Sequence, residues 1–442
     1  MPAPTNGSAT IDTEHLTRLF ERFATYDDVF LAVSGGPDSV ALMHLAAAWR
    51  DHCRPPCRLH VLTVDHGLRP EAAGEAQAVA VAAHALGLPA DVLTWAGPRP
   101  QSKVQESARE IRYRLLLARA EPTGTRAALV TAHHREDLAE TVLMRLARGA
   151  GIDGLSAMRP MTCRGGVDIL RPLLALTKAT LAKVVADAGA TSVEDPSNRN
   201  LDFERVRLRA AHAARVELNL TDEALALTAE RAARARVALE GLTDQRLQPC
   251  RHSPILLNCG VFEWPWQPGT IPDDTAVRIL MRVLPAVGGA VDRVRLLRVE
   301  RLWQGMQRKG FTGATLGNCV LTPGQTAPWF IYREPARGAL PRATLSASAP
   351  LIWDNRFEIR AAPEVGATEW SVRAFTRRDL KMLDCEAATQ NLPFPLPALE
   401  ATPVVEDVDG LLSIPALNVH RDATKAVHLS CRFLIERVLG KL

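Results

Sequence analysis

Several features that would mark other classes of protein are missing from this sequence of 442 residues. Its apolar runs all fall short of the roughly 18–20 residues that a membrane-spanning helix needs. The first 15 residues contain neither a basic start nor an apolar segment, so no secretory signal is expected. Neither a fixed-period repeat nor a low-complexity tract is present. We therefore expect a cytoplasmic globular protein that does not bind a membrane.

Cysteine usage and charge balance exclude two further classes. Eight cysteines are scattered between Cys53 and Cys431, unlike the dense framework of a small secreted domain, so reduced thiols are expected. Cys53 and Cys57 flank two prolines, and no second pair of ligands at zinc spacing accompanies them. The 53 basic and 49 acidic residues give a net charge of +4, so any nucleic-acid-binding surface has to be local.

Strand and helix patterns alternate along the first half of the chain. Buried strands are predicted at 29–33, 58–66 and 127–134, with alanine-rich helices between them. This alternation predicts an α/β fold with a parallel sheet and right-handed crossovers. In such a sheet the ligand crevice lies beyond the carboxyl ends of the strands. The polar stretches SGGPDS, DHGLR and HHREDLAE each follow one of these predicted strands.

The second half has a different character, and the length alone predicts two or three domains. A long helix is predicted at 221–245, one or two helices at 275–310, and a strand pair in GATLGNCVL and WFIYREP. Residues 337–350 are rich in small residues and proline, as in a linker, and a closing helix is predicted at 431–440. We expect three domains, with these boundaries: a catalytic α/β domain at 1–215, a mainly helical substrate-binding domain at 216–336, and a small α+β domain at 350–442.

The stretch SGGPDS (34–39) joins the first strand to a helix. Its glycines let the backbone approach a ligand, and Pro37 suits the first helical turn, where its missing N–H costs nothing. Ser39 and the helix dipole add attraction for an anion. The pattern is neither a Walker loop nor a Rossmann glycine motif. It predicts a phosphate-binding loop, with a serine-capped tight turn as the alternative, and Asp38 beside a phosphate calls for a metal ion between them.

Two further stretches supply candidate nucleotide contacts. After the second strand, Asp65 could bind a ribose or an adenine edge, and Arg69 could bind a phosphate. The alternative is that DHGLR forms only a turn, in which the glycine serves the backbone geometry. Arg109 and Arg112 are three residues apart on a predicted helix and share a face. They either neutralise phosphates or face solvent, as most helix charges do.

Paired acids open the helix that follows the third strand. Asp137 and Glu140 are three residues apart, so both carboxylates face the same way and could hold Mg²⁺ or the ammonium of an amine substrate. An acidic first turn that complements the helix dipole is the alternative. His133 and His134 do not predict zinc, because neighbouring residues at a strand end point in opposite directions.

Basic residues gather in two later regions. Five arginines follow the turn DPSN, a density that suits phosphate or RNA contact, at positions 199, 205, 207, 209 and 215. Residues 278–309 contain eight basic and two acidic residues, with Trp303 among them. A basic helical region with an aromatic residue predicts an RNA-binding surface, and a solvated amphipathic helix is the alternative.

The ordered set SGGPDS, VDHGLR, AHHREDLAETVLMRLARGAGIDGL, RPLL and EDPSNRN resembles the tRNA(Ile)-lysidine synthetase family over residues 27–210. The resemblance implies a PP-loop, or N-type ATP pyrophosphatase, fold of the HUP-like and Rossmann-like kind. It implies adenylation of C2 of the wobble cytidine in the CAU anticodon of tRNA(Ile), with release of pyrophosphate. The ε-amine of free L-lysine would then displace AMP and leave lysidine, which pairs with A instead of G.

The resemblance also implies roles for individual residues, with ATP and Mg²⁺ as cofactors. Arg112 and Arg205 would stabilise ATP or the adenylate, while Asp137 and Glu140 would act in catalysis through Mg²⁺ or lysine. Asp38 is implied as a catalytic residue and, with Asp137, as a magnesium ligand. The residues implied to bind the nucleotide are Ser34, Gly35, Gly36, Pro37, Asp38, Ser39, Asp65 and His133.

The sequence departs from the family pattern at a few positions, and three other functions were considered. Glu136 and Val206 stand where the family often has Asp and Asn, and residues 350–442 lack several expected motifs, although a tRNA contact is expected there. A thiolating PP-loop enzyme would carry paired cysteines, and an amidating synthetase would need an ammonia-generating domain. An RNA-binding protein with a vestigial loop is disfavoured because SGGPDS, Asp137 and Glu140 are all intact.

A homodimer is a further possible form of the protein, because an RNA of the size of a tRNA can engage two subunits.

Overall fold

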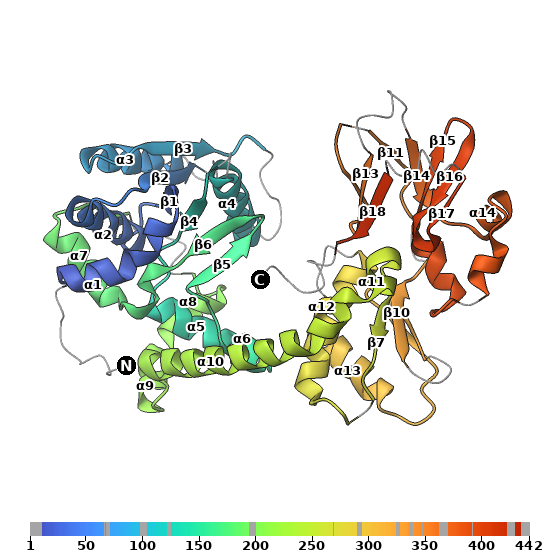
Figure 1. Ribbon diagram of the computed structural model, residues 1–442. Coiled ribbons are helices and arrows are strands. Elements are labelled where there is room, and N and C mark those ends of the chain that lie inside the picture. Colours follow the sequence, from blue (N-terminus) through green and yellow to red (C-terminus); the bar gives the residue numbers. More distant parts are fainter. Residues whose placement is uncertain are drawn as a thin grey trace. The chain divides into compact units, whose positions relative to one another are not determined.

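The computed structural model describes most of the chain, in two compact units formed by residues 1–236 and 237–442. Figure 1 shows both units, which are described separately below. The described residues are 11–65, 67, 71–97, 104–121, 125–193, 200–267, 269–289, 294–323, 328–335, 339–346, 348–361, 370–390, 392–421 and 429–434. Among the described helices, none combines the length and the apolar character that crossing a membrane requires.

The first unit is built on a six-stranded sheet, and the prediction of an α/β fold is confirmed. Its strand order is β3-β2-β1-β4-β6-β5, in which β5 runs antiparallel to β6 and the other neighbours pair in parallel. The strands are β1 (Asp28–Ala32), β2 (Arg58–Asp65), β3 (Ala90–Thr94), β4 (Ala127–Val130), β5 (Met161–Arg164) and β6 (Val167–Leu170). The three strands predicted from the sequence correspond to β1, β2 and β4.

Helices cover both faces of this sheet. The helices of this unit are α1 (Thr13–Phe20), α2 (Pro37–Cys53), α3 (Ala72–Ala85), α4 (Val104–Ala120), α5 (Arg135–Leu146), α6 (Ile152–Leu155), α7 (Lys178–Asp187), α8 (Glu204–Ala210) and α9 (His212–Glu217). Alternate residues of β1 serve the two faces, since successive strand residues point in opposite directions. Val29 and Leu31 pack in the core that contains α2 and α7, whereas Phe30 packs in the core that contains α4. This burial on both faces is typical of parallel sheets.

The second unit is helical and antiparallel. Helix α10 (Asp222–Leu247) contains the boundary between the units, and it is followed by α11 (Pro254–Cys259), α12 (Asp273–Gly288) and α13 (Leu296–Met306). A four-stranded sheet of order β7-β10-β9-β8 lies in the same region, which was predicted as mainly helical. Its strands are β7 (Phe262–Trp264), β8 (Ala314–Leu316), β9 (Cys319–Thr322) and β10 (Trp329–Arg333), so the predicted strand pair is confirmed.

The C-terminal part of this unit contains two further antiparallel sheets, of orders β11-β14-β15-β16-β17 and β12-β13-β18, and helix α14 (Arg377–Met382). The strands are β11 (Ala343–Leu345), β12 (Leu351–Trp353), β13 (Phe357–Ala361), β14 (Trp370–Ala374), β15 (Pro403–Asp407), β16 (Gly410–Ile414), β17 (Val419–His420) and β18 (Leu429–Phe433). Strand β11 lies within the segment predicted as a linker. One hydrophobic core joins Leu284 of α12, Ile331 of β10 and Phe357 of β13. The three-domain boundaries stay a prediction.

The prediction of a closing helix from residue 431 is wrong over the described part of that segment. Residues 429–433 form β18, which pairs antiparallel with β13. Phe433 is fully buried while Arg432 is exposed, a period-two pattern that favours a strand with one face on the core. Residues 435–440 lie outside the described part of the chain.

Candidate active site

The phosphate-loop stretch joins β1 to α2 in a closed turn. Ser39 Oγ accepts a hydrogen bond from the Ser34 backbone N–H at 3.1 Å and donates to the Gly36 carbonyl at 2.9 Å. Gly35 has a φ of +83°, which L side chains rarely adopt. Helix α2 then begins at Pro37, so the positive end of its dipole lies at the loop. The sequence left two interpretations open, a phosphate-binding loop or a tight turn closed by Ser39. The structure combines them, because the turn closed by Ser39 lies at the positive end of the α2 dipole.

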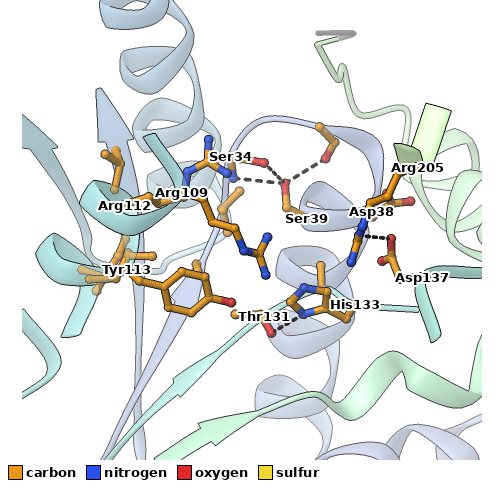
Figure 2. A pocket seen from close by; sticks show the side chains of 17 residues that line it. Ser34, Asp38, Ser39, Arg109, Arg112, Tyr113, Thr131, His133, Asp137 and Arg205 are labelled. Carbon is orange, nitrogen blue, oxygen red and sulfur yellow. Dashed lines mark hydrogen bonds and ion pairs between the residues drawn. The ribbon is translucent and has the colours of Figure 1, made fainter. Parts of the chain in front are cut away.

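The loop borders a cavity of about 240 Å³ at the carboxyl ends of β1, β2 and β4 (Figure 2). Apolar side chains from β2 and α4 form one wall, including Leu62, Val64 and Leu116. The predicted site residues that line the cavity are Ser34, Gly36, Asp38, Ser39, Arg112, His133, Asp137 and Arg205. The predicted residues that do not line it are Gly35, Pro37, Asp65 and Glu140.

Asp65 lies at the end of β2, close to the cavity edge. Its Oδ1 accepts a hydrogen bond from the Gly67 backbone N–H at 2.9 Å, so the carboxylate closes a local turn. Arg69 and His66 of the same stretch lie outside the described residues, as do residues 194–199 of EDPSNRN. The segment before 194 does reach the loop, because the Val193 backbone N–H donates to the Gly35 carbonyl at 2.9 Å.

Helix α4 places Arg109 and Tyr113 at the cavity, and Tyr113 was not predicted from the sequence. Figure 2 shows Arg109 and Tyr113 facing the same space as His133. The guanidinium carbon of Arg109 lies 5.3 Å from the centre of the Tyr113 ring, and that of Arg164 lies 5.2 Å from it. These distances are typical of cation–π contacts, which orient a guanidinium without removing its charge. Arg109 was left between phosphate contact and solvent, and the structure places it at the cavity.

His133 is a neutral group in a strongly basic surrounding. Its Nδ1 lies 2.8 Å from Thr131 Oγ1, a pair that holds the ring at the end of β4. Burial, with added repulsion from Arg171, Arg109 and Arg205, lowers the pKa of His133 to about 4. An uncharged imidazole at neutral pH suits contact with a nucleobase better than with a phosphate.

We expect the stability contributed by His133 to fall on acidification. The unfolded chain binds this proton below a pH of about 6.5, whereas the folded chain binds it only near 4, so the free energy of unfolding decreases as the pH falls through this window. Urea denaturation at pH 6.5 and 4.5, compared with His133→Gln, measures the effect. The wild type should lose more stability than the variant, and equal losses would contradict the depressed pKa.

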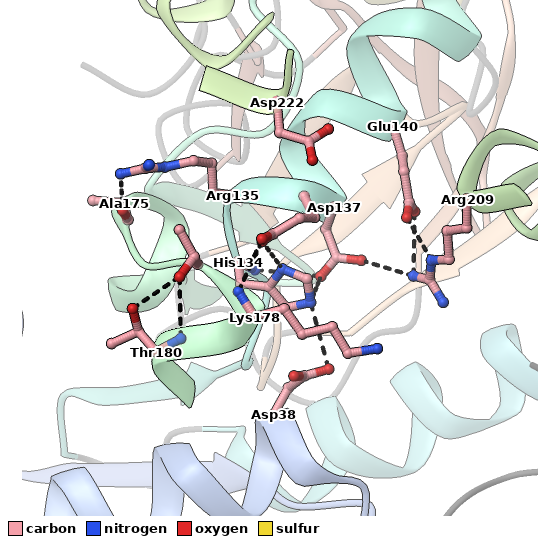
Figure 3. Close-up of polar contacts among 12 residues, drawn as sticks. Asp38, His134, Arg135, Asp137, Glu140, Ala175, Lys178, Thr180, Arg209 and Asp222 are labelled. Carbon is pink, nitrogen blue, oxygen red and sulfur yellow. Dashed lines mark hydrogen bonds and ion pairs between the residues drawn. The ribbon is translucent and has the colours of Figure 1, made fainter. Parts of the chain in front are cut away.

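His134 is the centre of a buried network that the sequence interpretation missed. Its Nε2 lies 3.4 Å from Asp38 Oδ2 and 3.5 Å from Asp137 Oδ2 (Figure 3). Its Nδ1 lies 2.9 Å from Glu136 Oε2. Burial alone would lower the pKa of His134, but the hydrogen bonds with Asp38 and Glu136 and the charge of Asp137 raise it to about 10. Burial is the largest single influence on Asp38 and raises its pKa, but the contact and charge of His134, together with the charges of Lys178 and Arg209, lower it below its ordinary value.

The paired acids of α5 meet two arginines of α8. Arg209 Nε lies 2.5 Å from Glu140 Oε1, and Arg209 Nη2 lies 3.5 Å from Asp137 Oδ1 (Figure 3). Arg205 Nη1 lies 3.4 Å from the same Asp137 oxygen (Figure 2). Glu140 is 2% exposed, and Arg205 Nη1 lies 3.9 Å from its Oε2. The expectation that both carboxylates face the same way agrees with this geometry. Arg209 had been grouped only with the general arginine cluster.

The donor set at Asp38 fits a magnesium ion. Asp38 Oδ1 is buried and has no hydrogen-bond partner among the described residues. Within that same part of the chain, no three His, Cys, Asp or Glu side chains converge at metal-binding distance. Mg²⁺ does not require such a cluster, because it usually takes one or two carboxylates together with phosphate oxygens and water.

The basic region of the second unit differs from its predicted form. Trp303 is 3% exposed and its indole N–H donates to Asp273 Oδ1 at 2.8 Å, so it packs in the core and cannot stack on a base. Arg278 and Arg282 are paired with acids, at 2.6 and 2.5 Å. The exposed basic residues on and just after α13 are Arg298, Arg301, Arg308 and Lys309, with Arg295 at its N-cap. Arg293 lies outside the described residues.

Comparisons with known proteins identify the family of this chain. The family model described as a PP-loop domain matches residues 9–215. The tRNA(Ile)-lysidine synthase of Bradyrhizobium sp. strain BTAi1 is 41% identical over 75% of this chain and 91% of its own. That of Methylobacterium nodulans is 41% identical over 72% and 94%, and that of Ruegeria pomeroyi is 36% identical over 87% of both chains. The chain belongs to the tRNA(Ile)-lysidine synthase family, with the PP-loop domain in its first unit.

Proposed function

We propose that this protein is an ATP-dependent ligase that converts the wobble cytidine of a CAU-anticodon tRNA(Ile) into lysidine. Cytidine is adenylated at C2 with release of pyrophosphate, and the ε-amine of free L-lysine then displaces AMP. The observation that carries the proposal is the convergence on one cavity of the SGGPDS loop, the neutral His133 and the Asp137–Arg205 pair, in a member of this family. The change of pairing partner from G to A follows from the product.

The first step needs stabilisation of the charge that develops on the leaving pyrophosphate. The loop at 34–39 and the start of α2 present a positive dipole end to the cavity. Arg112 and Arg205 line the same space and add fixed positive charge. Preorganised charge of this kind accelerates phosphoryl-group transfer mainly by electrostatics and positioning.

Asp38, with Asp137, is the part of the site that would hold Mg²⁺. Bound there, the ion would neutralise phosphate oxygens. Asp38 Oδ1 supports this role because it is buried and lacks a partner among the described residues. The two carboxylates approach the same nitrogen of His134, at 3.4 and 3.5 Å, and so lie side by side.

Asp137 and Glu140 are proposed to bind the amine of lysine in the second step. Both are carboxylates on one face of α5, and Glu140 is withdrawn from water, which strengthens its attraction for an ammonium. Asp65 is proposed to lie beside the bound nucleotide at the end of β2. A cytoplasmic location and a homodimer remain predictions.

The test is incorporation of radiolabelled lysine into transcripts of tRNA(Ile) with a CAU anticodon, with and without ATP and Mg²⁺. The control is tRNA(Met), which carries the same anticodon. ATP-dependent labelling of the isoleucine tRNA alone supports the proposal. ATP–pyrophosphate exchange without lysine transfer would keep the loop chemistry and discard lysine, and no turnover at all would favour an RNA-binding protein.

The exposed arginines of α13 are proposed to contact tRNA phosphates. Exchanging Arg298 and Arg301 for alanine should weaken tRNA binding and reduce the slope of log K against log salt by about one per arginine. Filter binding at several KCl concentrations measures this. Arg278→Ala is the matched control, because Arg278 is paired with Asp274 and only slightly exposed. An unchanged slope in the double variant would remove α13 from the interface.

A further inference from the structure

The His134 side chain joins three helix N-termini in the first unit. It precedes α5 as its N-cap residue, and it contacts Asp38 in the first turn of α2. Its third link runs through Glu136, whose two carboxylate oxygens each lie 3.0 Å from the Lys178 backbone nitrogen at the start of α7. Glu136 therefore caps α7 and holds the imidazole at the same time.

The partners of His134 fix which atoms it donates. Carboxylate oxygens face both ring nitrogens: Glu136 at Nδ1, and Asp38 and Asp137 at Nε2. A carboxylate is an acceptor only, so both nitrogens carry hydrogen and donate. The side chain is 3% exposed, so water does not compete for these positions. The imidazole is thus held from one side by Glu136 and holds Asp38 from the other.

Asp38 is the residue on which this arrangement acts. Its Oδ2 forms an ion pair with His134 Nε2 at 3.4 Å, while its Oδ1 is buried without a hydrogen-bond partner among the described residues. Asp38 also lines the cavity. Because a carboxylate is planar, fixing one oxygen restricts the direction of the other. Without His134, the side chain would lose the contact that selects its orientation.

We propose that His134 is a positioning residue for the nucleotide site: its ion pair with Asp38 Oδ2, anchored through Glu136 to the start of α7, keeps Asp38 Oδ1 available to magnesium-bound ATP. This deepens the proposed function and rests on its ATP-binding step. Partners that orient a metal-binding group typically change metal affinity or activity by about 10–100-fold when they are removed.

Two conservative variants separate positioning from a general structural role. In His134→Asn the amide can replace Nδ1 and bond Glu136, but nothing reaches Asp38. In His134→Gln the amide can replace Nε2 and bond Asp38, while the contact with Glu136 is lost. Calorimetric titration with ATP, in Mg²⁺ or in EDTA, gives the dissociation constants. We expect His134→Asn to weaken ATP binding in Mg²⁺ by about 10–100-fold and to change binding in EDTA little. His134→Gln restores the contact with Asp38 without the anchor to Glu136, so it should bind ATP more tightly than His134→Asn and less tightly than the wild type.

Two further variants guard against loss of folding as an explanation. His134→Asn combined with Asp38→Asn should bind no more weakly than Asp38→Asn alone, because both changes remove the same contribution. His60→Asn is the matched control, since His60 Nε2 bonds Asp28 Oδ1 at 3.1 Å and neither residue lines the cavity, and it should bind ATP as the wild type does. Circular dichroism checks the fold of each variant.

Several outcomes would overturn the proposal. Equal weakening in the Asn and Gln variants, equal weakening with and without Mg²⁺, or additive losses in the double variant would each show that His134 does not act through Asp38. A wild type that binds ATP but forms no lysidine would count against the proposed function and leave this comparison valid. A wild type that binds no ATP would overturn both.

Discussion

Asp137→Asn is expected to lower kcat/KM for lysidine formation by about 100- to 1000-fold, the loss that follows removal of one preorganised charged group from an active site. Asp137 is the predicted residue with the most contacts in the site. Its Oδ1 meets Arg205 and Arg209 at 3.4 and 3.5 Å, and its Oδ2 lies 3.5 Å from His134 Nε2. An amide in its place has no charge to balance these cations or to hold an ammonium.

The same exchange should leave the fold intact. Asp137 Oδ2 accepts the His134 backbone N–H at 3.3 Å in a capping box, and asparagine keeps an oxygen that can do so. The variant should therefore lose lysine incorporation, while the midpoint of its urea denaturation stays close to that of the wild type. Asp91→Asn is the matched control, because its half-exposed carboxylate pairs with Arg119 on the surface at 2.8 Å. A fully active Asp137→Asn would refute the role.

The sequence was most informative where structure is local. Strands β1, β2 and β4 were predictable because each is a short apolar run followed by a polar turn, and their burial on both faces explains the run. The turn at 34–39 was predictable because Gly35, Pro37 and Ser39 act within the turn itself. Strand β3 has mostly half-exposed residues at the edge of the sheet, so its apolar signal is weak.

The missed site residues depend on contacts between distant segments. His134 looked like a poor zinc ligand, and its real partners include Asp38, which the parallel sheet brings to the same edge. Nothing in the local sequence distinguishes Arg209 from the neighbouring arginines. The packing of α8 on α5 pairs it with Glu140. Local spacing does not show either pairing. The tertiary fold decides which charges meet.

Trp303 differs from these residues, because its burial could be predicted from the local sequence. Val299, Leu302, Trp303 and Met306 form the apolar face of α13 at spacings of three and four residues. The composition of the region suggested an aromatic residue among exposed arginines, whereas the helical period separates the two faces. Arg298 and Arg301 lie on the exposed face, so the surface of α13 is basic but does not include Trp303.

Glu140→Gln is expected to raise the KM for lysine by about 10- to 100-fold while tRNA-dependent ATP–pyrophosphate exchange continues. A hydrogen bond to a charged group is worth about 1.5–3 kcal/mol, and about 1.4 kcal/mol corresponds to tenfold in binding. Glu140 is 2% exposed and balances Arg209 at 2.5 Å. Neutralising it removes the attraction for the ammonium and leaves the charge of Arg209 balanced less well, by Asp137 at 3.5 Å, so that Arg209 repels lysine more strongly.

The two half-reactions distinguish this role from one in ATP binding. Glu140 does not line the cavity beside the phosphate loop, whereas Asp137 does, so their amide variants should differ: Asp137→Asn impairs both steps and Glu140→Gln mainly the lysine step. Glu140→Asp keeps the charge and should recover part of the lysine affinity. If Glu140→Gln instead slowed pyrophosphate exchange at an unchanged lysine KM, Glu140 would belong to the nucleotide side of the site, and Asp137 alone would carry the proposed amine contact.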